Sequence, residues 1–155
     1  SAVTGDGLVF VVGPKYSTMF AIRPATEGKV GKDHVAWTFA KQIPDASTPL
    51  FYGGKLYVVE DNRKVVTCLE PQSGKPLWQG KLECRKVIRA SLTGADGKLY
   101  LISEGGEAFV MAAGGSEFKL LHAAKFGGRY VRSTIVAAQG ALFVRTDDKL
   151  FCIRK

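Results

Sequence analysis

Hydrophobic and polar positions alternate in short runs along this 155-residue chain, and turn-forming residues separate the runs. The clearest unit covers residues 54–82, GKLYVVEDNRKVVTCLEPQSGKPLWQGKL. Apolar residues occupy both faces of its first run, residues 56–59, as in a strand that is covered on both sides. A polar turn leads to the β-branched run at residues 65–69, and a Pro-and-Gly-containing turn leads to a third run at residues 76–82. The unit predicts three strands and two turns.

This unit returns along the chain at a nearly constant period. Its Gly-x-apolar-aromatic core begins at Gly7, Gly54, Gly97 and Gly140, in steps of 47, 43 and 43 residues. A second anchor, which precedes the core, begins at Ser47, Ala90 and Ser133. A third anchor follows the core, with Trp37 and Trp78 in two repeats and Leu121 in place of the indole in the next. A period of about 40 to 50 residues with four short strands per repeat is typical of β-propeller blades.

The sequence therefore predicts an all-β fold: a β-propeller segment of about four blades, each a four-stranded antiparallel sheet, with the last blade incomplete. The blades are expected at residues 1–46, 47–89, 90–132 and 133–155, within one segment that forms the C-terminal part of a larger propeller. The innermost strands are predicted at residues 48–51, 91–93 and 134–137. Since no ten-residue stretch has a helical period with caps, we expect no α-helix.

Such a segment is not expected to close into a ring by itself, because the last blade lacks its outer strand and two blade faces would stay bare. Covering several hundred Å² of apolar face contributes on the order of 10 kcal/mol at about 25 cal/mol/Å². We therefore expect a partner for these faces, which is either the remaining blades of the parent chain or a second copy.

Composition adds few constraints. The chain carries 22 basic and 14 acidic residues, a net charge of +8, and it contains no apolar run of membrane-spanning length and no signal-peptide pattern at its start. Cys68, Cys84 and Cys152 are expected to be unpaired, with Cys68 and Cys152 packed at corresponding places in third strands. We expect no nucleic-acid partner, because the repeated aromatic positions suit a core.

The stretch TCLEPQSGKPLW at residues 67–78 resembles the tryptophan-docking repeat of the quinoprotein-like (PQQ-like) propellers. The resemblance implies that Trp37, Trp78 and Gly74 dock neighbouring blades, with each indole N–H reaching a backbone carbonyl of a turn. The family includes quinone-dependent dehydrogenases, outer-membrane assembly scaffolds and sensor domains. Its catalytic members carry a vicinal cysteine pair, a calcium site and a catalytic Asp, whereas no two cysteines are adjacent in this sequence.

The resemblance thus implies a non-catalytic module for protein or ligand recognition or scaffolding, in a bacterial extracytoplasmic (periplasmic or secreted) protein, with no catalytic, cofactor or metal residue in this segment. The alternative is the C-terminal part of a quinoprotein dehydrogenase, for which PQQ and calcium would be the cofactors. His34 and His122 stand alone, and Asp61-Asn62 and Asp147-Asp148, which could suggest calcium, are better explained as turn residues.

One charge pattern predicts a binding site. Lys86 and Arg129 occupy one position of the loops that lead into the innermost strands, and Arg89 and Arg132 occupy another, both at the 43-residue period. Like charges on adjacent blades repel each other unless an anion lies between them, and guanidinium groups suit carboxylate or sulfate. We expect a basic rim that binds an acidic peptide or an acidic or sulfated glycan, although solvated side chains would give the same pattern.

Overall fold

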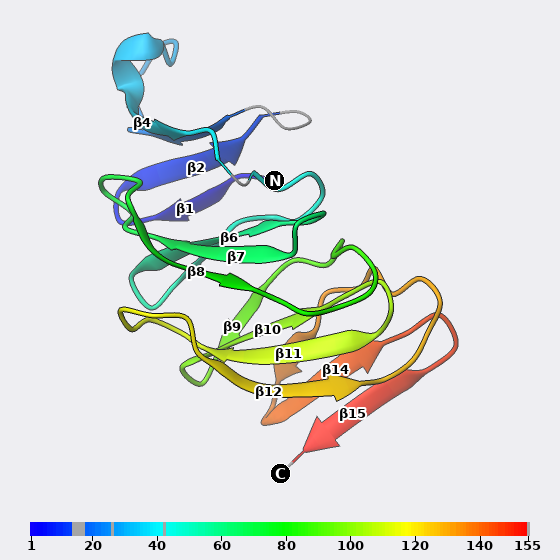
Figure 1. Cartoon of the computed structure of the whole chain (residues 1–155). Coiled ribbons are helices and arrows are strands. Elements are labelled where there is room, and N and C mark those ends of the chain that lie inside the picture. Colours follow the sequence, from blue (N-terminus) through cyan, green and yellow to red (C-terminus); the bar gives the residue numbers. More distant parts are fainter. Residues whose placement is uncertain (14–17, 26, 42, 155) are drawn as a thin grey trace.

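The computed structural model describes residues 1–13, 18–25, 27–41 and 43–154. In this described part, fifteen strands form four antiparallel sheets of four, four, four and three strands (Figure 1). A single 3-10 turn, η1 (Lys32–His34), is the helical element of the described residues, which contain no α-helix. The predicted all-β propeller segment with an incomplete last blade is confirmed.

The sheets follow one another along the chain. The first contains β1 (Val3–Gly5), β2 (Leu8–Val12), β3 (Met19–Ile22) and β4 (Val35–Phe39). The second contains β5 (Leu50–Tyr52), β6 (Lys55–Glu60), β7 (Val65–Leu69) and β8 (Pro76–Lys81). The third contains β9 (Thr93–Ala95), β10 (Lys98–Ile102), β11 (Glu107–Ala112) and β12 (Leu120–Lys125). The fourth contains β13 (Val136–Ala138), β14 (Ala141–Arg145) and β15 (Leu150–Arg154).

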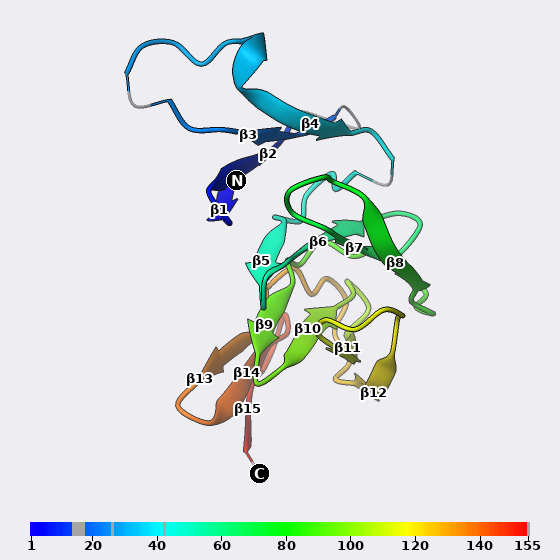
Figure 2. The same cartoon turned by 90° about the vertical axis from the view of Figure 1, so that its left-hand side faces the viewer.

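Each sheet keeps its strands in chain order, and the sheets stack face to face. Figure 2 shows β1, β5, β9 and β13 along one side of the stack and β4, β8 and β12 along the other. Of these first strands, β1 contacts β5, β5 contacts β9, and β9 contacts β13. The short first strands are therefore the innermost ones, as the repeat predicts.

A tight turn joins the first and second strands of every sheet. Its two central residues have positive φ in all four sheets, for example 50° at Asp96 and 67° at Gly97. Positive φ at both positions defines a type I′ turn, whose twist matches that of the flanking strands and which favours Gly at the second position. This geometry explains why the repeated core begins with glycine.

The three interfaces between neighbouring sheets hold the buried core. The first interface contains Phe10 and Met19 packed with Leu56 and Leu69. The second contains Tyr57, Val66 and Cys68 together with Leu99 and Met111, and the third contains Tyr100 and Ile102 together with Val144. Because the second and third sheets contribute to two interfaces each, their strands are apolar on both faces, as the pattern of residues 56–59 predicts.

The innermost strands begin about two residues later than expected. Thr48 and Ser91 lie before β5 and β9, and their backbone N–H groups donate to hydroxyls of the next repeat: Thr48 N to Ser91 Oγ at 2.9 Å and Ser91 N to Thr134 Oγ1 at 3.2 Å. These hydroxyl residues thus link neighbouring repeats and do not pair within their own sheets, so the predicted starts at residues 48, 91 and 134 are wrong.

Candidate functional site: the polar loops between the sheets

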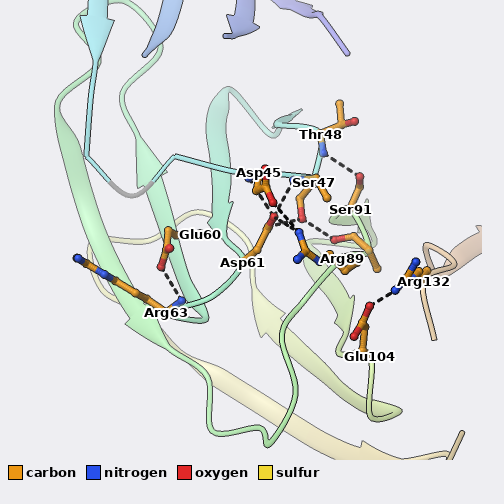
Figure 3. A network of polar contacts seen from close by, with 12 residues as sticks. Asp45, Ser47, Thr48, Glu60, Asp61, Arg63, Arg89, Ser91, Glu104 and Arg132 are labelled. Carbon is orange, nitrogen blue, oxygen red and sulfur yellow. Dashed lines mark hydrogen bonds and ion pairs between the residues drawn. The ribbon is translucent and has the colours of Figure 1, made fainter. Parts of the chain in front are cut away.

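The predicted basic residues lie in the loops that lead from the outer strand of one sheet to the first strand of the next. These loops and the ends of β6 and β10 carry a network of polar contacts (Figure 3). At its centre, the carboxylate of Asp61 is buried directly after β6. It accepts hydrogen bonds from the backbone N–H groups of Asp45 at 2.9 Å and Ala46 at 2.7 Å, and from the hydroxyl of Ser47 at 2.9 Å. Asp61 therefore fixes the loop that enters the second sheet.

Arg89 reaches this carboxylate cluster from the next loop along the chain. Its Nη1 lies 2.7 Å from Asp45 Oδ2 and 3.8 Å from Asp61 Oδ2. Burial raises the pKa of Asp61, and the hydrogen bonds from the loop and the charge of Arg89 offset part of that rise. The hydrogen bond to Asp45 raises the pKa of Arg89 further. Arg89 thus ties two consecutive loops together through carboxylates of the chain itself.

One period later, Arg132 repeats the arrangement with a different acid. Its Nε donates to Glu104 Oε1 at 2.8 Å, and Glu104 follows β10 as Asp61 follows β6. The Arg132 side chain is 67% exposed, whereas that of Arg89 is 30% exposed. Arg132 is therefore the more open of the two guanidinium groups.

The two remaining predicted residues meet each other directly. Lys86 Nζ donates to the backbone carbonyl of Arg129 at 2.9 Å and lies 4.6 Å from the centre of the Tyr130 ring. Tyr130 is 63% exposed. The structure therefore brings Lys86 and Arg129 together beside an exposed aromatic ring, and it pairs Arg89 and Arg132 with acids.

Sequence reasoning missed these acids. Asp61, Glu104 and Asp147 recur in steps of 43 residues after the second strand of their sheets, and Asp147 Oδ1 accepts from the backbone N–H of Arg129 at 3.3 Å. Asp61 lies in the turn between β6 and β7, as predicted, but its side chain is buried and holds another loop, which the sequence did not indicate. Comparing the period of the acids with that of the arginines could have revealed the pairing.

The tryptophans lie at two of the sheet interfaces. Trp37 Nε1 donates to the carbonyl of Pro71 in the following sheet at 2.8 Å, and Trp78 Nε1 donates to that of Gly114 at 3.1 Å. Gly74 lies under the Trp37 indole, where an added Cβ would lie 2.5 Å from Trp37 Cε3. Each indole therefore reaches the turn that follows the third strand of the next sheet.

The third sheet replaces the indole differently from the prediction. Trp37 pairs with Ala21 and Trp78 pairs with Cys68, and the corresponding position opposite Val110 is His122. Leu121 lies in the bulge of β12 beside that position. The assignment of Leu121 as the counterpart of the indole is wrong, because the connection between β11 and β12 is longer than that between β7 and β8. The bulge itself recurs at the same place in all three sheets. His122 is exposed.

The cysteines differ in burial. Cys68 is buried and burial raises its pKa to about 11, and the same cause raises the pKa of Cys84 to about 11. Cys152 is exposed, so the expectation that it packs is wrong for the described residues. The described part of the chain holds no group of three or more His, Cys, Asp or Glu residues arranged for a metal ion. None of its helices is long and apolar enough to cross a membrane.

The stacked four-stranded sheets and the tryptophans that bond the next sheet define a PQQ-like β-propeller segment. A family model described as "Outer membrane protein assembly factor BamB" matches residues 28–119, which is more than half of the chain. The chain belongs to this family. No curated protein matched the sequence.

Several solved structures share the fold at low sequence identity. BamB from Moraxella catarrhalis has a TM-score of 0.71 at 14% identity, over 99% of this chain and 44% of its own. The computationally designed Ika4 protein has a TM-score of 0.72 at 12% identity, over 98% of this chain and 89% of its own. Quinohemoprotein alcohol dehydrogenase from Comamonas testosteroni has a TM-score of 0.60 at 18% identity, over 80% of this chain and 20% of its own. The chain thus spans less than half the length of the BamB structure.

Proposed function

We propose that this chain is a non-catalytic propeller module that recognises or scaffolds other proteins in a bacterial extracytoplasmic protein. The observation that carries the proposal is the match over residues 28–119 to a family described by an outer membrane protein assembly factor. The loop network joins the chain's own residues, with Arg89 paired to Asp45 and Arg132 paired to Glu104, so it stabilises the module itself. Fractionation of cells that produce the tagged protein tests the compartment: recovery with a periplasmic or secreted marker is expected, and recovery with a cytoplasmic enzyme would contradict it.

One proposed contact surface is the bare face of the fourth sheet. Val136, Phe143 and Cys152 are neighbours across β13, β14 and β15, and Val136 is 53% exposed. Another propeller blade, from the remaining parent chain or from a second copy, would cover this face as the third sheet covers the second. Light scattering on the 155-residue chain tests the need for such a cover: a stable, non-aggregating monomer would contradict it, and a dimer would favour the second copy.

A second proposed surface is the basic rim of Arg89 and Arg132, helped by Lys86 and Arg129. Arg132 is open, and Lys86 and Arg129 add charge beside the exposed ring of Tyr130. An acidic peptide or an acidic or sulfated glycan would bind Arg132 first, since Arg89 must release Asp45 before its guanidinium can bind another carboxylate.

The rim is tested with a glutamate-rich peptide and a sulfated oligosaccharide, titrated against the intact protein. Arg89→Ala/Arg132→Ala is expected to lose about 2–4 kcal/mol of binding free energy, as removal of two charge-assisted contacts predicts. Because Arg89 also ties two loops together, Arg132→Ala alone is measured as well, with Arg63→Ala as control; Arg63 points away from Arg89 in Figure 3. Unchanged affinity and unchanged salt dependence in the double variant would overturn the proposal that the rim binds these ligands.

The dehydrogenase alternative is tested separately, because a shared fold with a quinohemoprotein at 18% identity does not indicate activity. We expect that adding PQQ with Ca²⁺ to the intact protein gives no absorbance shift and no dye-linked alcohol oxidation. Saturable binding with turnover would replace the proposal by the dehydrogenase.

A further inference from the structure

Two of the three sheet interfaces are filled near the first strands by one aromatic ring packed on one glycine. At the first interface, the ring of Phe51 lies on Gly5, where an added Cβ would be 2.2 Å from Phe51 Cγ. At the second, the ring of Tyr52 lies on Gly94, where an added Cβ would be 2.5 Å from Tyr52 Cγ. Each close approach leaves no room for a larger residue than glycine.

At the third interface both members of this pair are small. Ala95 stands one period after Tyr52, and Ala137 stands one period after Gly94. A cavity of about 520 Å³ lies between these two sheets. Its walls include Ala95, Asp96, Tyr100, Ala137, Gly140 and Arg154. The cavity thus occupies the place that an aromatic side chain of the chain itself fills at the neighbouring interface.

The backbone N–H group that the tyrosine hydroxyl contacts at the second interface also has a counterpart at the third. The hydroxyl of Tyr52 accepts a hydrogen bond from the backbone N–H of Gly97, 3.0 Å away, in the turn between β9 and β10. Gly140 occupies the same position of the turn between β13 and β14, with φ of 71° against 67° at Gly97. Ala95 offers no hydroxyl, so the Gly140 N–H has no counterpart of the tyrosine oxygen to donate to.

We propose that this cavity binds a para-substituted phenol, and specifically the side chain of a tyrosine from a partner protein. The ring would lie between Ala95 and Ala137, as the Tyr52 ring lies on Gly94, and its hydroxyl would accept from the Gly140 N–H. An apolar cavity of about 150 Å³ is enough to bind benzene, so the volume suffices for a phenol. That the phenol belongs to a partner protein rests on the proposed function, whereas the phenol site itself does not.

The charges at the wall favour one kind of substituent. Asp96 is paired with Lys98, whose Nζ lies 2.6 Å from Asp96 Oδ2, and Arg154 is exposed. The excess positive charge is expected to disfavour a cationic substituent, so 4-hydroxyphenylacetate should bind better than tyramine, by about 2–5-fold at low salt.

The direct test is a titration of the intact protein with p-cresol, the analogue of the tyrosine side chain, followed by the methyl NMR signals. The signals of Leu142 and Ile153, which line the cavity, are expected to shift with a Kd on the order of 1 mM, typical of a ligand this small. Those of Leu56 and Leu69, in the first interface, are expected not to shift. Absence of any shift at Leu142 and Ile153 up to about 10 mM p-cresol would overturn the site.

Two further arms separate the claims. Ala95→Tyr/Ala137→Gly rebuilds the Tyr52–Gly94 pair in the cavity and should abolish the p-cresol response, while Ala123→Tyr, on the exposed outer strand β12, should retain it. A response that survives in a folded Ala95→Tyr/Ala137→Gly variant would overturn the site; should that variant not fold, Ala95→Leu is used in the same way.

N-acetyl-tyrosine amide should bind several-fold more tightly than N-acetyl-phenylalanine amide. Equal affinity of the two would contradict the bond to Gly140, and binding of p-cresol without the tyrosine derivative would contradict a partner's side chain as occupant.

Discussion

The second and fourth sheets have the same strand order but very different surroundings. Leu50, Tyr57 and Cys68 face the third sheet across β5, β6 and β7, and both Tyr57 and Cys68 are fully buried. Their counterparts in the fourth sheet are Val136, Phe143 and Cys152, of which Val136 and Cys152 are exposed. The fourth sheet therefore repeats the apolar positions of the second on a face that no described strand covers.

One tryptophan of the second sheet, Trp78, makes both apolar contacts and a hydrogen bond at the interface with the third sheet. In the second sheet Trp78 packs with Tyr57 at a ring distance of 5.9 Å and with Phe118 at 5.7 Å, and it bonds the turn of the third sheet. The interface thus gains apolar burial and one directed hydrogen bond from a single side chain.

The largest expected effect comes from removing this indole. Trp78→Ala should lower the free energy of unfolding by about 3–5 kcal/mol, because it leaves a cavity between two sheets and removes the hydrogen-bond donor of the Gly114 carbonyl. Leu121→Ala, at an exposed position of the third sheet, should cost under about 1 kcal/mol. Urea unfolding of the intact protein measures both, and equal losses would mean that the indole does not dock the sheets.

A smaller effect is expected from the buried acid. Asp61→Ala should cost about 2–4 kcal/mol, because three donors of the loop lose their acceptor and Arg89 loses a carboxylate 3.8 Å away. Asp147→Ala removes the acid of the fourth sheet, which accepts one backbone bond at 3.3 Å, and should cost under about 1 kcal/mol. A similar loss in both variants would contradict the distinct role of Asp61.

The pH dependence of Asp61 has a definite sign. Its folded-state pKa is raised above the ordinary 3.8, so the folded protein holds this proton more tightly than the unfolded chain does. The stabilisation from the bound proton is complete below about pH 4 and is lost as the pH rises through the folded-state pKa. Relative to Asp61→Asn, the wild type should therefore lose stability over this window; a relative gain would contradict the raised pKa.

The smallest effect concerns one hydroxyl. The Tyr57 hydroxyl accepts from the N–H of Gly114 at 2.7 Å, and burial raises the pKa of Tyr57 to about 12. Tyr57→Phe should cost about 1–3 kcal/mol by leaving that N–H unpaired. Tyr130→Phe, at an exposed position, serves as the control and should leave the free energy of unfolding within about 0.5 kcal/mol. Thermal unfolding at several denaturant concentrations distinguishes the two.

Much of the fold could be predicted because periodic features determine it. The glycine of each hairpin turn, the second strands with apolar residues on both faces and the tryptophan spacing all repeat, and together they specify stacked sheets. The starts of the first strands were misplaced because Thr48 and Ser91 bond to the next repeat, a contact that no local pattern records.

The candidate site was predicted less completely. The repeated arginines were visible, but the burial of Asp61 was not, since an acid after a strand looks like any turn residue. The counterpart of the indole in the third repeat, His122, was missed because the connection between β11 and β12 is longer than that between β7 and β8. The cavity at Ala95 is recognised only when the packing of Tyr52 on Gly94 is known.

The measurement that tests the account most directly is the reactivity of the two matched cysteines in the intact protein. Cys68 and Cys152 occupy the same place in the second and fourth sheets, but Cys68 is flanked by β8 and covered by the third sheet, whereas Cys152 has neither neighbour among the described residues. If another blade covers the fourth sheet, iodoacetamide labelling followed by peptide mass spectrometry should find both thiols protected, with rates well below that of the unfolded protein. Labelling of Cys152 at the rate of the unfolded chain, while Cys68 stays protected, would show that this face meets no blade and would contradict the account.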